Sequence, residues 1–111
     1  VQYFSDFWEY DSAENTWTKK ADFAGVPMRS NIGFSIGDKG YIGIGATESG
    51  FTKEIWEYEP SSNKWTKKSS FKGIARHYVN SFSIGNKGYI IGGYDPDVNI
   101  SPEVWEFDPE N

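Results

Sequence analysis

Three side chains, two arginines and one histidine, are the candidates for chemistry in this sequence. Arg29, Arg76 and His77 each lie a few residues ahead of an apolar, strand-like stretch. A guanidinium group can hold a carboxylate through two parallel hydrogen bonds, so both arginines are candidates for binding a ligand or partner. An arginine at such a place can also tie loops together by bonding their carbonyl oxygens, and we favour this structural role.

His77 is the single histidine in the sequence, and no serine stands in a nucleophile-elbow context beside which it could act as a base. A lone histidine more often packs within a loop. With one histidine and no cysteine, the ligands of a zinc site are lacking. The sequence therefore predicts no catalytic residue, no metal and no cofactor.

The segment Asp-Pro-Asp-Val-Asn-Ile-Ser that begins at Asp95 is similar to the start of a calcium-binding loop. Asp95, Asp97 and Asn99 alternate as oxygen ligands would, and Glu106 stands at the twelfth position. However, Ile100 stands where such a loop needs glycine, and Glu106 falls in an expected strand. We favour a solvated turn, and a looser calcium contact from the two aspartates stays open.

Aromatic residues make up 18% of the chain and divide into two groups. Trp8, Trp56 and Trp105 recur at a regular spacing within expected strands, which favours burial between stacked sheets over a platform for sugars. Phe51, Tyr78 and Tyr94 fall in expected loops, and we interpret them as candidates for contacting a partner, although an aromatic residue there can also pack its own loop.

Composition narrows the choice of partner. The 111 residues carry a net charge of −5, and the basic residues cluster no further than pairs such as Lys19-Lys20. Nucleic acid is an improbable partner, because phosphate binding needs clustered cations. No apolar run is long enough to cross a bilayer, and no secretion leader begins at Val1, although a cleaved leader would leave no trace.

The chain repeats itself. Trp8-Glu-Tyr10 recurs 48 residues later as Trp56-Glu-Tyr58 and, after a further 49, as Trp105-Glu-Phe107. Trp17-Thr-Lys-Lys20 likewise recurs as Trp65-Thr-Lys-Lys68. A period near 50 residues is typical of propeller-type repeats.

One period holds four expected strands, named a to d, at about residues 32–36, 40–45, 54–59 and 64–67. Short turns rich in Gly, Asp and Asn join a to b, and the turn Pro60-Ser-Ser-Asn63 joins c to d. Longer b–c connections (46–53 and 94–102) and d–a connections (21–31 and 69–80) should lie together at the opposite end. This end, which we call the loop face, is the predicted binding site.

The repeat resembles the kelch motif. Tyr-Ile-Ile-Gly-Gly93 supplies the glycine pair, Val104-Trp-Glu-Phe-Asp-Pro109 ends in the expected aromatic-Asp-Pro, and Trp17 and Trp65 open strand d. The first copy departs in having Gly43-Ile-Gly45. The resemblance implies blades of a β-propeller, with an arginine near the ends of the d–a loops facing the central funnel. The amino-acid sequence of the repeats is also similar to that of kelch arrays in exported bacterial proteins, especially from the Bacteroidetes. This resemblance implies an extracellular or cell-envelope location.

An all-β chain is therefore expected, with strands c and d of a partial blade in residues 1–20, a complete blade in 21–68 and strands a to c of a further blade in 69–111. About two blades cannot close a ring, since propellers usually have roughly four to eight. We favour a fragment of a larger propeller over copies that assemble into a ring. In either case neighbouring blades are expected partners.

The resulting hypothesis is a non-catalytic interaction or scaffold module that binds protein or glycan through the loop face. Two alternatives stay open. The first is a part of a propeller enzyme acting on sugars, resembling either a copper-dependent sugar oxidase or a sialic-acid isomerase. The second is a purely structural spacer in a surface protein.

Overall fold

The computed structural model describes residues 2–97 and 99–110, and every regular element within these ranges is a β-strand. Val1, Val98 and Asn111, which belong to the predicted segments 1–20 and 69–111, lie outside the described residues. Nowhere in the described ranges does a helix occur that is long and apolar enough to span a membrane. The strands are β1 (Phe7–Asp11), β2 (Thr16–Lys20), β3 (Met28–Arg29), β4 (Ile32–Ile36), β5 (Lys39–Thr47), β6 (Gly50–Glu59), β7 (Lys64–Lys67), β8 (Asn80–Ile84), β9 (Lys87–Ile91) and β10 (Val104–Phe107).

These strands form three antiparallel sheets. The first sheet is the hairpin β1–β2, and the third is β8–β9–β10. In the second, β4 to β7 pair in succession, and the short β3 pairs with the far end of β5. Two-residue turns beginning at Gly37 (φ 60°) and Gly85 (φ 58°) join β4 to β5 and β8 to β9. Glycine adopts this left-handed conformation without the steric cost that a side chain would add.

The expected strands at 32–36 and 64–67 are confirmed at both ends, and those at 40–45 and 54–59 are confirmed but longer. The predicted long connection at 46–53 is wrong, because β5 and β6 continue through it and leave only Glu48 and Ser49 between them. The ladder resumes beyond a bulge at Ile44, whose φ is 46°, so that Ala46 pairs with Phe51. One extra residue in a strand locally disrupts the ladder without ending it.

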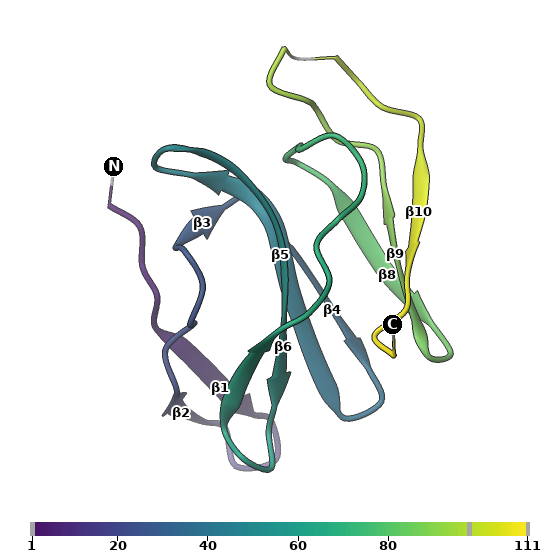
Figure 1. Cartoon of the computed structure of the whole chain (residues 1–111). Coiled ribbons are helices and arrows are strands. Elements are labelled where there is room, and N and C mark those ends of the chain that lie inside the picture. Colours follow the sequence, from purple (N-terminus) through teal and green to yellow (C-terminus); the bar gives the residue numbers. More distant parts are fainter. Residues whose placement is uncertain (1, 98, 111) are drawn as a thin grey trace.

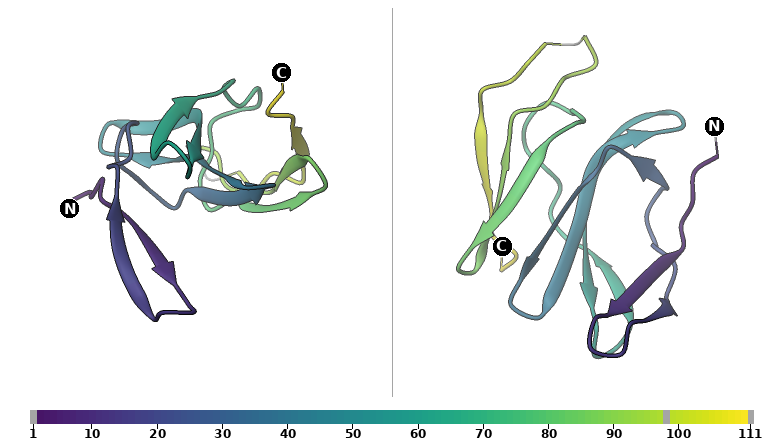
Figure 2. Two further views of the ribbon diagram at one scale, coloured as in Figure 1. Left: turned by 90° about the horizontal axis from the view of Figure 1, so that it is seen from below. Right: turned by 180° about the vertical axis from the view of Figure 1, so that it is seen from behind.

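The second sheet lies between the other two, so the sheets follow one another in chain order (Figure 1, Figure 2). The β1–β2 hairpin projects from the side away from the third sheet (Figure 2). The core lies between the second and third sheets, where β4 contacts β8 and β9. Its buried members are Ile32, Tyr41, Ile44, Ile55, Phe71 and Ile90.

Side-chain contacts repeat along with the sequence. Phe34 stacks on Tyr41 with ring centroids 5.5 Å apart, and Phe82 stacks on Tyr89 at 5.3 Å. Each tryptophan of the Trp-Glu-aromatic motif donates its indole N–H to the carboxylate two residues before it: Trp8 to Asp6 (2.7 Å), Trp56 to Glu54 (3.1 Å) and Trp105 to Glu103 (3.1 Å). The three sheets are therefore built from one local plan.

The prediction that all three of these tryptophans lie between sheets needs one correction. Trp56 packs edge-on against Phe23, and Trp105 packs in the same way against Phe71. Trp8, in contrast, is 47% exposed. Phe23 and Phe71 each belong to the connection that follows the preceding sheet. Within the described residues no sheet precedes β1, so no aromatic ring from such a connection packs against Trp8.

Candidate functional site

The loop face lies at one end of the sheets, as expected. In Figure 1 the β4–β5, β6–β7 and β8–β9 turns lie at the lower end, and the β5–β6 turn and the connection from β9 to β10 lie at the upper end. The two upper connections differ, since the first is a tight hairpin and the second is a long irregular segment. That segment is held by paired hydrogen bonds between His77 and Tyr94, each 3.0 Å from nitrogen to oxygen.

Four of the predicted partner-contacting residues meet in one aromatic cluster. The His77 ring lies 4.9 Å from the Phe51 ring, 4.5 Å from the Tyr78 ring and 6.3 Å from the Tyr94 ring, measured between centroids. Tyr78 and Tyr94 in turn lie 6.2 Å apart, edge to face. Phe51 comes from β6 in the second sheet and the other three from the third repeat, so the cluster spans two sheets.

Tyr78 is the most exposed member of this aromatic cluster. Its side chain is 63% accessible, and its backbone has φ 55°, a left-handed conformation that costs energy for a bulky residue. The conformation is imposed by the neighbouring residue, because His77 is fixed to Tyr94 by the two backbone hydrogen bonds. Ser30 occupies the matching position one repeat earlier, with φ 53°. Both repeats therefore have a left-handed residue at this position, but of the two only Tyr78 carries a phenol.

The two candidate arginines have different surroundings. Arg76 is 4% exposed, and its guanidinium donates to the Ile74 carbonyl (2.9 Å), to Ser101 Oγ (2.9 Å) and to Glu103 Oε1 (2.9 Å). It also lies 5.0 Å over the Phe71 ring. Arg76 thus joins the segment before β8 to the segment before β10, which matches the structural role.

Arg29 was expected in a loop and instead lies in β3, opposite Ala46. Ala46 pairs with Phe51 on its other side, so these three residues form one row across the second sheet. Residues paired in this way project from the same face of a sheet. The Arg29 side chain is exposed and forms no hydrogen bond or ion pair with any other described residue. It is therefore the arginine available to a ligand.

The Asp95 carboxylate is used within its own loop. Its Oδ1 accepts from the backbone N–H groups of Asp97 and Asn99, both at 2.9 Å, and its Oδ2 accepts from the Asn99 side chain at 3.1 Å. These bonds, first of all that from the Asn99 backbone, lower the pKa of Asp95. Such bonds define a turn closed by an aspartate. Among the described residues no three His, Cys, Asp or Glu side chains are grouped as metal ligands would be.

Sequence reasoning missed two apolar residues that extend the loop face. Ile100 is 75% exposed and Ile74 is 63% exposed, and both line a shallow pocket of about 310 Å³ beside Arg76. The repeat contained a signal for Ile100, because Ile100 stands 49 residues after Phe51. The structure has the matching pairs: Ile100 forms a β-bridge with Tyr94, and Phe51 pairs with Ala46. The loop face thus carries the exposed ring of Tyr78, two exposed aliphatic side chains and the exposed Arg29 guanidinium, together with the buried Arg76.

A scan against protein-family models and a search of curated protein sequences each returned no match to this chain.

Proposed function

We propose that this chain is a non-catalytic interaction module that binds a protein or glycan through its loop face. The observation that carries the proposal is the aromatic cluster of Phe51, His77, Tyr78 and Tyr94. Aromatic side chains provide large contact area for little loss of conformational freedom, and they are enriched where proteins bind partners. A side chain held outward by a strained backbone is a recurrent mark of binding sites.

Rigidity around the aromatic cluster supports the same proposal. The buried Arg76 bonds and the backbone pairing of His77 with Tyr94 fix the loops before a partner arrives. A preorganised surface loses less conformational entropy on binding, so more of the contact energy appears as affinity. Tyr78 provides an exposed ring, Tyr94 provides a partly buried ring beside it, and Arg29 provides a cation for a carboxylate or a sugar acid.

The architecture to which this site belongs is, in our proposal, a kelch-type β-propeller, of which the chain forms about two blades. Three antiparallel sheets stacked in chain order with repeated contacts support this assignment, as does the lateral contact between β4 and β8. The hydroxyl of Ser81 in β8 donates to the carbonyl of Gly33 in β4 at 3.1 Å, which links the matching first strands of two successive repeats. The location remains proposed as extracellular or in the cell envelope.

Binding is tested with defined ligands. Panels of purified glycans and of displayed peptides are screened against the chain, and each ligand found is titrated against Tyr78→Ala, Arg29→Ala and the matched control Tyr10→Ala. Tyr10 is an exposed tyrosine (47%) on the first sheet, where it contacts Trp17. We expect Tyr78→Ala to weaken binding by about tenfold or more, and Tyr10→Ala to leave it unchanged. Equal effects of the two variants would contradict the proposed site.

A further inference from the structure

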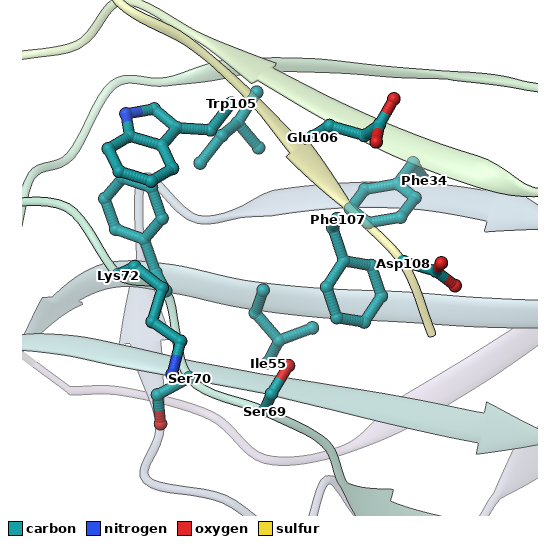
Figure 3. A pocket seen from close by; sticks show the side chains of 11 residues that line it. Phe34, Ile55, Ser69, Ser70, Lys72, Trp105, Glu106, Phe107 and Asp108 are labelled. Carbon is teal, nitrogen blue, oxygen red and sulfur yellow. The ribbon is translucent and has the colours of Figure 1, made fainter. Parts of the chain in front are cut away.

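A pocket of about 290 Å³ lies between the second and third sheets, away from the aromatic cluster. Its walls are mostly apolar and come from β6, from the segment after β7 and from β10. Figure 3 shows the Phe107 ring extending from β10 toward Ile55, and the Trp105 ring at the end of the pocket on the side of Lys72. Ser69 and Lys72 lie along the opposite wall (Figure 3).

One repeat earlier, the matching place is filled by an indole. Trp65 of β7 lies 4.9 Å from Phe7, 5.2 Å from Phe23 and 5.0 Å from Tyr58, measured between ring centroids. Its indole N–H donates to the carbonyl oxygen of Ala21 at 3.1 Å. A tryptophan with three aromatic neighbours and a satisfied N–H is well suited to close such a space.

The residues around Trp65 correspond one by one to residues that line the pocket. Phe7, Ala21 and Phe23 are each followed 48 residues later by Ile55, Ser69 and Phe71, and Tyr58 is followed 49 residues later by Phe107. All four later residues line the pocket. The pocket therefore has the walls of an indole site, and within the described residues no side chain takes the place of Trp65.

The edge of the third sheet shows what kind of segment would bring the indole. Within the part of the chain that the structure describes, β10 is an edge strand paired with β9 alone, whereas its counterpart β6 pairs with β7 and sets Trp65 opposite Tyr58. An unpaired edge offers a row of backbone donors and acceptors to an added strand.

Charge on the two strands is complementary as well. In the second sheet, Lys67 of β7 lies 3.0 Å from Glu54, and Lys68 lies 3.8 Å from Glu57. The counterparts of these two carboxylates are Glu103 and Glu106, both exposed. Glu106 has no ion pair with another described residue, although it accepts a hydrogen bond from Tyr89. An incoming strand with lysines two and three positions after its tryptophan would meet this carboxylate.

From these observations we infer that β10 and the pocket form an acceptor site for an extended peptide strand of the type Asn-Lys-Trp-Thr-Lys-Lys. The strand runs antiparallel to β10 and sets its tryptophan opposite Phe107, with the ring in the pocket. A second copy of this chain is a poorer occupant, although β2 carries Trp17. One edge of β2 is already paired with β1, and pairing through the other edge would turn Trp17 to the opposite face.

The probe is a labelled synthetic peptide, Ser-Ser-Asn-Lys-Trp-Thr-Lys-Lys, which copies residues 61–68. Its affinity for the whole chain is measured by fluorescence anisotropy, beside a matched peptide with alanine in place of tryptophan. We expect the alanine peptide to bind at least about tenfold more weakly. The amides of β10 should also exchange more slowly with solvent when the tryptophan peptide is bound, because they would lie in a paired ladder.

Variants of the chain distinguish binding at β10 from binding at the loop face. Glu106→Lys should weaken the tryptophan peptide through charge repulsion, and Tyr78→Ala, on the loop face, should leave its affinity unchanged. The inference is overturned if the two peptides bind equally, or if neither binds below about 1 mM. It is also overturned if the chain forms dimers that block the peptide and that Trp17→Ala abolishes, because the occupant would then be a second copy.

Discussion

The second and third sheets carry the same bond in different surroundings. Tyr41 donates its hydroxyl to Glu57 at 2.7 Å in the second sheet, and Tyr89 donates to Glu106 at 2.8 Å in the third. Glu57 is 9% exposed, whereas Glu106 is exposed. The sequence specifies the bond, and the neighbouring strands decide how much it stabilises the fold. In the second sheet β7 provides that neighbour, and in the third sheet nothing described occupies its place.

The strand β7 should therefore account for most of the difference in stability between the two sheets. Substitution of its tryptophan should lower the free energy of unfolding more than any other change proposed below. Trp65→Ala removes a ring packed against three aromatic neighbours, and we expect the free energy of unfolding to fall by about 3 kcal/mol. Trp17 is the matching residue of β2 but is 65% exposed, so Trp17→Ala should cost less than about 1 kcal/mol. Urea unfolding followed by circular dichroism measures both. Similar losses would mean that burial by the neighbouring sheet is not what distinguishes them.

The paired tyrosines give a smaller effect. Tyr41→Phe deletes the donor to a buried carboxylate and should lower the free energy of unfolding by about 1–2 kcal/mol. Tyr89→Phe removes the same bond where water can replace it, and should lower the free energy of unfolding clearly less than Tyr41→Phe does. Burial and then the Glu57 hydrogen bond raise the pKa of Tyr41, so its phenol remains a donor throughout the neutral range. If the Tyr89 variant lost as much stability, the exposed bond would be worth as much as the buried one.

The smallest effect concerns two matching carboxylates and depends on pH. The hydrogen bond from Lys67 and then that from Trp56 hold the pKa of Glu54 below its ordinary 4.5, and the Trp105 indole and then Arg76 lower that of Glu103. A lowered pKa in the folded state adds stability that is complete above the ordinary value and is lost as pH falls through the folded one. Glu54→Gln and Glu103→Gln should therefore lower the urea midpoint at neutral pH, and the deficit should shrink as pH falls below 4.5 through the lowered pKa values of the folded state.

A double substitution separates the two carboxylates. Lys67→Met should add little to Glu54→Gln, because both remove one ion pair, and should add fully to Glu103→Gln, whose cation is Arg76. The Glu54 effect should stay below about 1 kcal/mol, since that pair is partly exposed and screened by salt. Full additivity with Glu54→Gln would show that the lysine does not act through this carboxylate.

Local patterns predicted the short elements well but failed at one of the long connections, residues 46–53. The strands at 32–36 and 64–67 are bounded by dense turn residues, and their ends follow from those residues alone. At 46–53 the run Ala-Thr-Glu-Ser-Gly-Phe-Thr-Lys appears polar enough for a loop. It forms a hairpin because Ala46 is buried and paired with Phe51, a tertiary circumstance that composition does not reveal.

The candidate site shows the same division. Position in the repeat was enough to identify Phe51, His77, Tyr78 and Tyr94 as residues of the loop face. It could not separate Arg29 from Arg76, because burial of a guanidinium depends on partners such as Ser101 and Glu103 that lie 25 and 27 residues away in the chain. The backbone kink at Tyr78 was likewise invisible, since it follows from the pairing of His77 with Tyr94.

The unpaired edge of β10 also bears on how concentrated solutions of this chain behave. Two such edges laid side by side would bring the exposed Glu106 of each molecule close to that of the other, and like charges facing each other across a ladder repel. Carboxylates at this edge thus act as gatekeepers against aggregation at neutral pH. Acidification would neutralise them and remove this protection, so fibrous precipitates should form more readily in acid than in alkali.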